Sequence, residues 1–287
     1  MINRLVLGTA QFGMSYGISN KTGQTSSCEA VNILQHATSV GIDTLDTAIA
    51  YGDAEQMLGN YGMNKWKVIS KLPPIPKDCA DVIQWVNTIV EKSLKSLRIK
   101  QLHGLLLHNP SDLLEERRDE LKIALKELKS RGLVNKVGIS IYNEDSLNEI
   151  ICNNQIDIVQ APVNILDRRL VDLGWFTKLT SENIEIHARS VFLQGLLLMA
   201  PLSRPKKFNR WNDLWSVWYQ WLGDFKLTPV QACLGYVFNQ LEINRVIVGI
   251  NSLEQLKEIT SAVDIVIPEI PSEFNCVDID LINPSRW

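Results

Sequence analysis

Four side chains that could together deliver a proton lie at the ends of, or shortly after, short apolar segments: Asp46, Tyr51, Lys71 and His108. A phenol has a pKa of about 10, so it is a weak acid near neutral pH unless a neighbouring cation stabilises its anion. An ammonium group held by a carboxylate would supply that cation. An imidazole would orient a carbonyl group or share the proton. These residue types therefore predict a tuned proton donor, provided that the fold brings them together.

The elements that would position these residues alternate along the whole chain. The predicted strands are residues 2–7, 42–45, 67–70, 102–107, 134–139, 156–160, 184–187 and 245–248. The predicted helices are residues 27–40, 53–61, 78–97, 115–131, 144–152, 171–180, 228–240 and 253–262. Strands rich in Val, Ile and Leu, without polar alternation, indicate a parallel sheet that is buried on both faces. We therefore expect an α/β fold, a (β/α)8 TIM barrel forming one domain over residues 1–287, with the four side chains at its C-terminal mouth.

An open, doubly wound sheet uses the same alternation of strands and helices and is the competing fold. Its nucleotide-binding signature GxGxxG is missing, because the first strand is followed by the segment Gly8–Gly13, which reads GTAQFG. Residues 201–225 depart most from the regular spacing and form a predicted helical insertion after the seventh strand. This insertion contains Trp211, Trp215, Trp218 and Trp221. The tryptophans predict either an aromatic face packed on the barrel wall or a lid or dimer contact at the mouth.

Composition excludes several classes of protein. The net charge of −3, with 21% charged and 45% hydrophobic residues, gives no basic footprint for nucleic acid. No apolar segment is long enough to span a membrane, and the N-terminal residues lack the features of a secretion signal. The five cysteines are scattered and include no CxxC pair, so we expect a reducing, cytoplasmic location and no metal site.

The ordered set of motifs resembles the aldo-keto reductase family over nearly the whole chain. The matching motifs are Leu7-Gly8-Thr9, Phe12-Gly13, Asp46-Thr47-Ala48, Tyr51-Gly52, Ser70-Lys71, Leu107-His108, Val137-Gly138-Ile139-Ser140, Val159-Gln160 and Gly195-Leu196-Leu197. The resemblance implies an NAD(P)(H)-dependent oxidoreductase that reduces an aldehyde or ketone, including sugar-derived carbonyls, to an alcohol. Asp46, Tyr51, Lys71 and His108 would be its catalytic residues, with Tyr51 as the proton donor. Because the first predicted strand starts at residue 2, we expect a barrel without the N-terminal β-hairpin of many relatives.

The resemblance also implies that NADP or NAD lies extended across the mouth. The implied cofactor contacts are Gly8, Thr9, Asp46, Ser140, Gln160, Arg189, Ser190, Phe192, Gln194, Gly195, Gly249, Asn251, Ser252 and Gln255. Ile141 replaces an asparagine that is usual in the family, for which Asn143 is a candidate substitute. Arg189 aligns with an aromatic residue that stacks on the nicotinamide. Its guanidinium would stack on the ring, pair with a phosphate, or form a salt bridge across the mouth.

The last predicted helix opens with a segment whose free N–H groups suit a phosphate. Family members that prefer NADP often carry basic residues here, but the aligned positions hold Gly249, Gln255 and Ile259. The grip on a 2′-phosphate is therefore weak. We expect modest discrimination and tolerance of NAD, unless another residue such as Lys257 supplies the charge.

The substrate pocket is predicted to be lined by Tyr16, Tyr51, Trp66 and His108, with the Trp211–Trp221 segment and the C-terminal tail nearby. The expected partner is a small-molecule carbonyl compound, and the expected state is a monomer or weak homo-oligomer. Two other functions stay open. One is a dinucleotide-binding regulatory or partner-binding barrel with little turnover, and the other is a hydrolase or lyase that uses Asp46 and His108 without nicotinamide.

Overall fold

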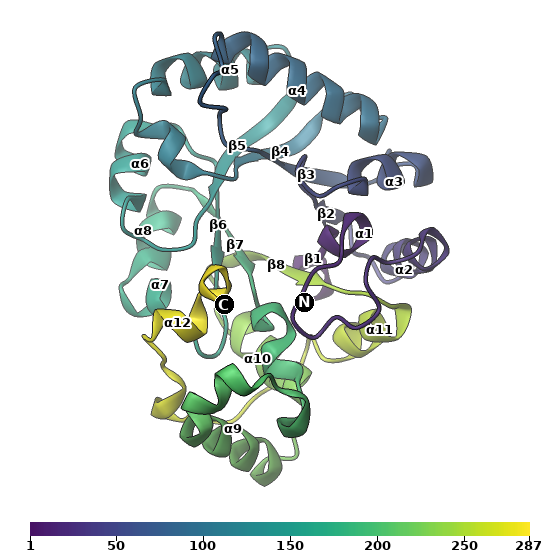
Figure 1. The fold of residues 1–287 in the computed structure, drawn as a ribbon, viewed down its shortest axis with the longest axis vertical. Coiled ribbons are helices and arrows are strands. Elements are labelled where there is room, and N and C mark those ends of the chain that lie inside the picture. The colour runs from purple at the N-terminus through teal and green to yellow at the C-terminus, as the bar shows by residue number, and fades with distance from the viewer.

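Eight parallel strands close into one barrel surrounded by helices (Figure 1). The computed structural model describes all residues from Met1 to Trp287. The strands are β1 (Leu5–Gly8), β2 (Thr44–Asp46), β3 (Lys67–Leu72), β4 (Leu102–Leu107), β5 (Val134–Ser140), β6 (Ile158–Pro162), β7 (Glu185–Arg189) and β8 (Ile243–Gly249). They follow one another in chain order around the barrel, and β1 closes it by pairing with β8. The predicted single-domain (β/α)8 barrel is confirmed.

Helices cover the outside of this sheet, as the alternating pattern predicts. The α-helices are α1 (Ala10–Gly13), α2 (Ser27–Ser39), α3 (Ala54–Tyr61), α4 (Val82–Leu97), α5 (Arg118–Ser130), α6 (Leu147–Asn153), α7 (Arg169–Asp172), α8 (Trp175–Ser181), α9 (Asn212–Asp224), α10 (Pro229–Phe238), α11 (Leu253–Ser261) and α12 (Ile279–Ile282). Side-chain caps fix several of their starts. The Thr228 hydroxyl accepts from the Gln231 N–H in a capping box, and the Ser252 hydroxyl accepts from the Gln255 N–H. None of the helices is long and apolar enough to cross a membrane.

Two predicted elements differ from the structure for local reasons. The first strand starts at Leu5 rather than residue 2, because Ile2–Arg4 forms a 3-10 turn (η1). The predicted helix 171–180 is two short helices, α7 and α8, separated at Gly174. Gly174 has φ of 74°, a left-handed conformation that glycine adopts without steric cost and that ends a helix.

A small apolar cluster separate from the main core lies on three strands of the barrel. Ile69, Leu106 and Ile158 come from β3, β4 and β6, are fully buried, and form a cluster separate from the main core. The main core lies between the outer face of the sheet and the helices. The interior cluster matters for function, because residues two positions further along each strand share its inward direction.

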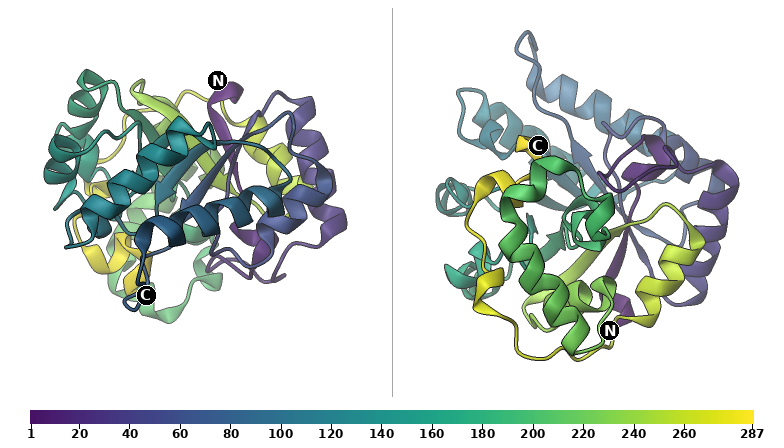
Figure 2. Two further views of the ribbon diagram at one scale, coloured as in Figure 1. Left: turned by 90° about the horizontal axis from the view of Figure 1, so that it is seen from above. Right: turned by 60° about the horizontal axis from the view of Figure 1, so that its bottom comes forward.

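The segment between β7 and α10 contains the 3-10 turns η4 (Pro201–Ser203) and η5 (Lys206–Trp211), followed by α9. The indole rings of Trp218 and Trp221 are buried, lie 6.1 Å apart, and both pack against Phe274 at 5.5 Å. Figure 2 shows α9 beside the C-terminal segment on the outside of the barrel. The Trp-rich face is thus occupied by packing within the chain.

Candidate active site

Strand periodicity points three polar side chains into the mouth. Lys71, His108 and Gln160 each lie two residues beyond one of the inward-facing apolar residues Ile69, Leu106 and Ile158. Since side chains alternate across a strand, each polar group stands directly above the apolar floor of the barrel. Apolar side chains therefore close the site from below, and residues of the loops after β1 and β7 line its sides.

A buried ion pair forms the base of the site. The Lys71 ammonium lies 2.5 Å from Asp46 Oδ1 and also donates to the Thr47 carbonyl at 3.0 Å. The second carboxylate oxygen, Oδ2, accepts from Gln160 Nε2 at 2.7 Å. Lys71 is 1% exposed and Asp46 is 4% exposed. Both charges are thus removed from water and compensated by each other.

Electrostatics keep the ammonium charged in this buried position. Burial acts to lower the pKa of Lys71, but the Asp46 carboxylate and the Tyr51 phenol act to raise it, and the net shift is upward. The ammonium lies 5.2 Å from the centre of the Tyr51 ring. Lys71 therefore provides a fixed positive charge beside the phenol.

His108 lies beside Tyr51 and completes the group. The two rings meet edge to face, with centroids 6.0 Å apart. Burial, together with the positive charges of Lys71 and Arg189, lowers the pKa of His108 to about 4. The imidazole is therefore neutral at pH 7, when one ring nitrogen carries a hydrogen-bonding proton and the other accepts. The structure thus brings Asp46, Tyr51, Lys71 and His108 together at one mouth.

The loop that carries Tyr51 is held by close contact with α1. A Cβ atom added to Gly13 would lie 1.7 Å from the Tyr51 carbonyl oxygen, and one added to Gly52 would lie 2.3 Å from the Gly13 carbonyl oxygen. Gly52 also has φ of 55°. Glycine is required at both positions because two backbone segments touch. The motifs Phe12-Gly13 and Tyr51-Gly52 therefore serve one contact that sets the position of the phenol.

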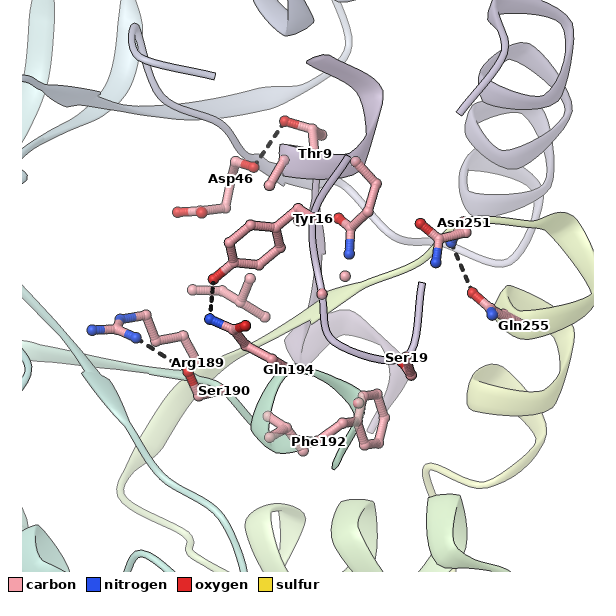
Figure 3. Close-up of a pocket in the computed structure, with 18 of the residues that line it drawn as sticks. Thr9, Tyr16, Ser19, Asp46, Arg189, Ser190, Phe192, Gln194, Asn251 and Gln255 are labelled. Atoms are coloured by element: carbon pink, nitrogen blue, oxygen red, sulfur yellow. Dashed lines mark hydrogen bonds between the residues drawn. The ribbon is translucent and has the colours of Figure 1, made fainter. Parts of the chain in front are cut away.

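A cavity of ≈ 440 Å³ runs from these residues to the start of α11. Most of the residues expected to bind cofactor line it: Gly8, Thr9, Asp46, Ser140, Gln160, Arg189, Ser190, Phe192, Gln194, Gly195, Gly249, Asn251 and Gln255. Figure 3 shows Arg189 and Asp46 on one side of this pocket and Asn251 and Gln255 on the other. The lining therefore extends from the catalytic residues to the first turn of α11.

The polar groups at the reaction end suit a primary amide. Ser140 Oγ donates to Gln160 Oε1 at 3.2 Å, while Gln160 Nε2 donates to Asp46. These bonds leave one N–H of Gln160 and lone pairs on Gln160 and Ser140 for a ligand. The Thr9 side chain is fully buried, and its hydroxyl donates to the main-chain carbonyl of Asp46 at 3.0 Å, so it holds the backbone that carries the carboxylate.

The loop after β7 closes over the pocket in a strained conformation. Ser190, Leu193 and Gln194 all have φ between 48° and 57°, which is uncommon outside glycine. The Gln194 carbonyl accepts from the Ile18 N–H, and the Gln194 side chain donates to the Tyr16 hydroxyl at 3.1 Å (Figure 3). The loops after β1 and β7 therefore clasp each other across the mouth. Strain that surrounding contacts maintain is characteristic of functional sites.

Arg189 is a positive charge in this pocket without an acidic partner. Its guanidinium stacks on the Tyr142 ring at 4.3 Å and donates to the Ile141 carbonyl at 2.7 Å and to Ser190 Oγ at 3.1 Å. Its Nε is buried and has no hydrogen-bond partner. Arg189 thus forms no salt bridge across the mouth and keeps hydrogen-bonding capacity for a ligand.

Several predicted positions lie elsewhere, and each has a physical reason. Trp66 as a pocket residue is wrong, because it precedes β3 and so lies at the N-terminal end of the barrel, opposite the mouth. Ser252 lines a neighbouring polar cleft, where its hydroxyl caps α11. Asn143 is exposed and donates to Asp145. The C-terminal Trp287 packs on Phe208, away from the pocket.

The pocket also contains residues that sequence reasoning missed. Tyr142, Gln11 and Glu258 line it. Two of these residues could have been predicted from their positions in the sequence. Tyr142 comes shortly after β5, and Glu258 lies one helical turn beyond Gln255 on α11. No group of His, Cys, Asp and Glu residues in the structure is arranged to hold a metal ion.

Comparison with known proteins agrees with this geometry. The model of the aldo/keto reductase family matches residues 4–275, which include all eight strands and the pocket. The uncharacterized oxidoreductase YqkF of Bacillus subtilis is 26% identical over 273 residues, 88% of each chain. The NADH-specific methylglyoxal reductase of Escherichia coli is 26% identical over 161 residues, covering 51% of this chain and 49% of that enzyme. The aldo-keto reductase AKR11C1 from Bacillus halodurans, in its holo form, has the same fold, with a TM-score of 0.74 at 21% identity over 93% of this chain and 88% of that one.

Proposed function

The chain belongs to the aldo/keto reductase family of NAD(P)H-dependent oxidoreductases, and we propose that it reduces small-molecule aldehydes or ketones with Tyr51 as the proton donor. The observation that carries this proposal is the buried Lys71–Asp46 pair beside the Tyr51 ring, in a pocket open to a ligand. A phenol in this position has a fixed cation next to it and little water around the cation.

The residues divide the work of carbonyl reduction. A bound reduced nicotinamide supplies the hydride to the carbonyl carbon. Tyr51 transfers its proton to the oxygen that becomes an alkoxide, and the Lys71 ammonium stabilises the phenolate that is left. Asp46 and Gln160 hold the ammonium in place. His108, being neutral, donates a hydrogen bond to the carbonyl oxygen and orients it.

The cofactor would lie in this cavity, between the catalytic residues and the start of α11. Ser140 and Gln160 offer hydrogen bonds to the carboxamide, and Arg189 offers free N–H groups and a flat cationic surface. Gly249 and Gln11 both line this cavity and pack closely, since a Cβ at Gly249 would lie 2.6 Å from Gln11 Nε2. Positions 249, 255 and 259, where basic residues would bind a 2′-phosphate, hold Gly249, Gln255 and Ile259. NADH is therefore an acceptable hydride donor.

The test is a titration followed by a turnover screen. NADH and NADPH are titrated into the protein by quenching of tryptophan fluorescence, and aldehydes and ketones are then screened through the loss of nicotinamide absorbance. The proposal predicts binding and measurable reduction. Binding without turnover of any carbonyl would indicate a dinucleotide-binding regulatory module. The absence of binding would favour a reaction that uses Asp46 and His108 without nicotinamide.

A further inference from the structure

A second, polar cleft adjoins the far end of the main pocket, between the loop after β1, α2 and the start of α11. It shares Ser19, Asn251 and Gln255 with the main pocket, so the two form a continuous surface. Figure 1 shows α2 and α11 side by side on the same flank of the barrel. The cleft contains one acidic and one basic residue, Glu29 and Lys21.

Glu29 reaches from α2 to the first turn of α11. Its Oε1 accepts a hydrogen bond from the Leu253 N–H at 2.6 Å. Two more backbone donors at this end are also in use, because the Asn251 N–H donates to Gln255 Oε1 at 2.7 Å and the Gln255 N–H donates to Ser252 Oγ at 3.3 Å. A helix N-terminus binds anions through such free N–H groups and its dipole. Here a carboxylate of the protein already takes that place.

The buried polar atom without a partner at this junction is a hydrogen-bond acceptor. Asn251 Oδ1 is buried and has no partner in the structure. Glu29 keeps a second carboxylate oxygen, to which only a weak contact of 3.5 Å from Asn32 is made. The junction therefore offers acceptors to a ligand that carries a hydroxyl donor, and it offers a negative charge to a ligand that carries a phosphate.

We propose that Glu29 makes this protein selective for NADH over NADPH, an inference that rests on the proposed reductase function. The two cofactors differ at one position of the adenosine ribose, which carries a hydroxyl in NADH and a phosphate of charge about −2 in NADPH. A hydroxyl can donate to Glu29 or to Asn251 Oδ1. A phosphate would be repelled by Glu29 and would find the Leu253 and Gln255 N–H groups in the first turn of α11 occupied.

Repulsion of the 2′-phosphate by Glu29 is a different cause of selectivity from the absence of basic residues that would bind this phosphate. Missing cations would leave NADPH bound about as well as NADH, whereas a fixed carboxylate rejects it actively. Lys21 is the competing influence, because it is the cation of the same cleft. Its side chain is exposed, so solvent screens it more than the half-buried Glu29.

The experiment measures dissociation constants for NADH and NADPH by fluorescence quenching in the wild-type protein and in Glu29→Gln. Glutamine retains an oxygen for the Leu253 N–H but removes the charge. The wild type should bind NADH at least tenfold more tightly than NADPH. Glu29→Gln should improve NADPH binding about tenfold, the effect of removing one like charge at partly screened distance, and leave NADH within about threefold. Glu127→Gln, which removes an exposed charge on α5, should leave both constants unchanged.

Two results would overturn the proposal while leaving the reductase function intact. One is equal or tighter binding of NADPH by the wild-type protein, which would assign the 2′-phosphate to Lys21. The other is a Glu29→Gln variant with the wild-type ratio of the two constants at an unchanged melting temperature. If Glu29→Gln unfolds, Glu29→Ser, measured by the same titration on its folded fraction, should shift the ratio in the same direction. Failure to bind either cofactor would instead defeat the proposed function itself.

Discussion

Replacing Lys71 with methionine should damage both stability and activity, and the structure gives the size of the first effect. Methionine has a similar length but no charge, so Asp46 would keep only the hydrogen bond from Gln160. Both members of the pair are almost fully buried. Removing one partner of a buried pair leaves an uncompensated charge and costs about 3–5 kcal/mol. The free energy of unfolding should fall by that amount.

A double variant separates this structural cost from the chemistry. In Asp46→Asn/Lys71→Met no charge is left unpaired, and the asparagine oxygen can still accept from Gln160. Urea unfolding, followed by tryptophan fluorescence, should show that the double variant is more stable than Lys71→Met alone, with a coupling of at least about 2 kcal/mol in the double-mutant cycle. Carbonyl reduction should stay low in both variants, because the phenolate has lost its cation.

Two results would refute this reasoning. Stability losses that simply add would show that the two charges do not compensate each other in the folded protein. Reduction by the folded Lys71→Met protein at more than about one tenth of the wild-type rate would show that the ammonium is not needed for proton transfer, since a positioned acid is worth about 10²–10⁴-fold.

Two further predictions concern the other parts of the site. Burial lowers the pKa of His108 to about 4, so a plot of kcat/KM for reduction against pH should show no ionisation near 6.5. The value of kcat/KM should fall only as the pH approaches 4 and the imidazole gains a proton. A clear inflection near pH 6.5 that disappears in His108→Gln would contradict this assignment. Gly13→Ala should lower the rate of carbonyl reduction more than tenfold, because its Cβ displaces the Tyr51 carbonyl. The control Gly223→Ala, with open space around it in α9, should keep full activity and gain about 0.5–1 kcal/mol of stability in urea unfolding. Equal activity in the two variants would show that the Gly13 contact does not position the phenol.

The sequence was sufficient for the barrel and for the position of residues on strands. Strand periodicity of two is a local rule, so Lys71 and Gln160 could be assigned to the mouth from their places in the chain alone. The same rule, applied with the direction of the strand, would have excluded Trp66, which precedes β3 and therefore lies at the wrong end. Aromatic character alone predicted that residue, and aromatic residues also pack elsewhere on a barrel.

The rest of the site depends on contacts between distant parts of the chain. Gln194 meets Tyr16 and Ile18 across the mouth, and Glu29 meets Leu253 between two helices that are far apart in sequence. No local pattern encodes such pairs, because they follow from the closure of the barrel and the packing of its outer helices. The left-handed conformations of Ser190, Leu193 and Gln194 after β7 could not be predicted from the sequence for the same reason. Surrounding contacts hold these residues in a conformation that such residue types rarely adopt.

Single-turnover reduction of an aldehyde by Tyr51→Phe, with prebound NADH, tests the assignment of the proton donor most directly. Phenylalanine keeps the ring that packs against His108 and removes only the hydroxyl. The dissociation constant of NADH should stay within about threefold of wild type, while the rate of nicotinamide oxidation should fall by about 10²–10⁴-fold. A rate within tenfold of wild type, at full cofactor occupancy, would show that another group delivers the proton.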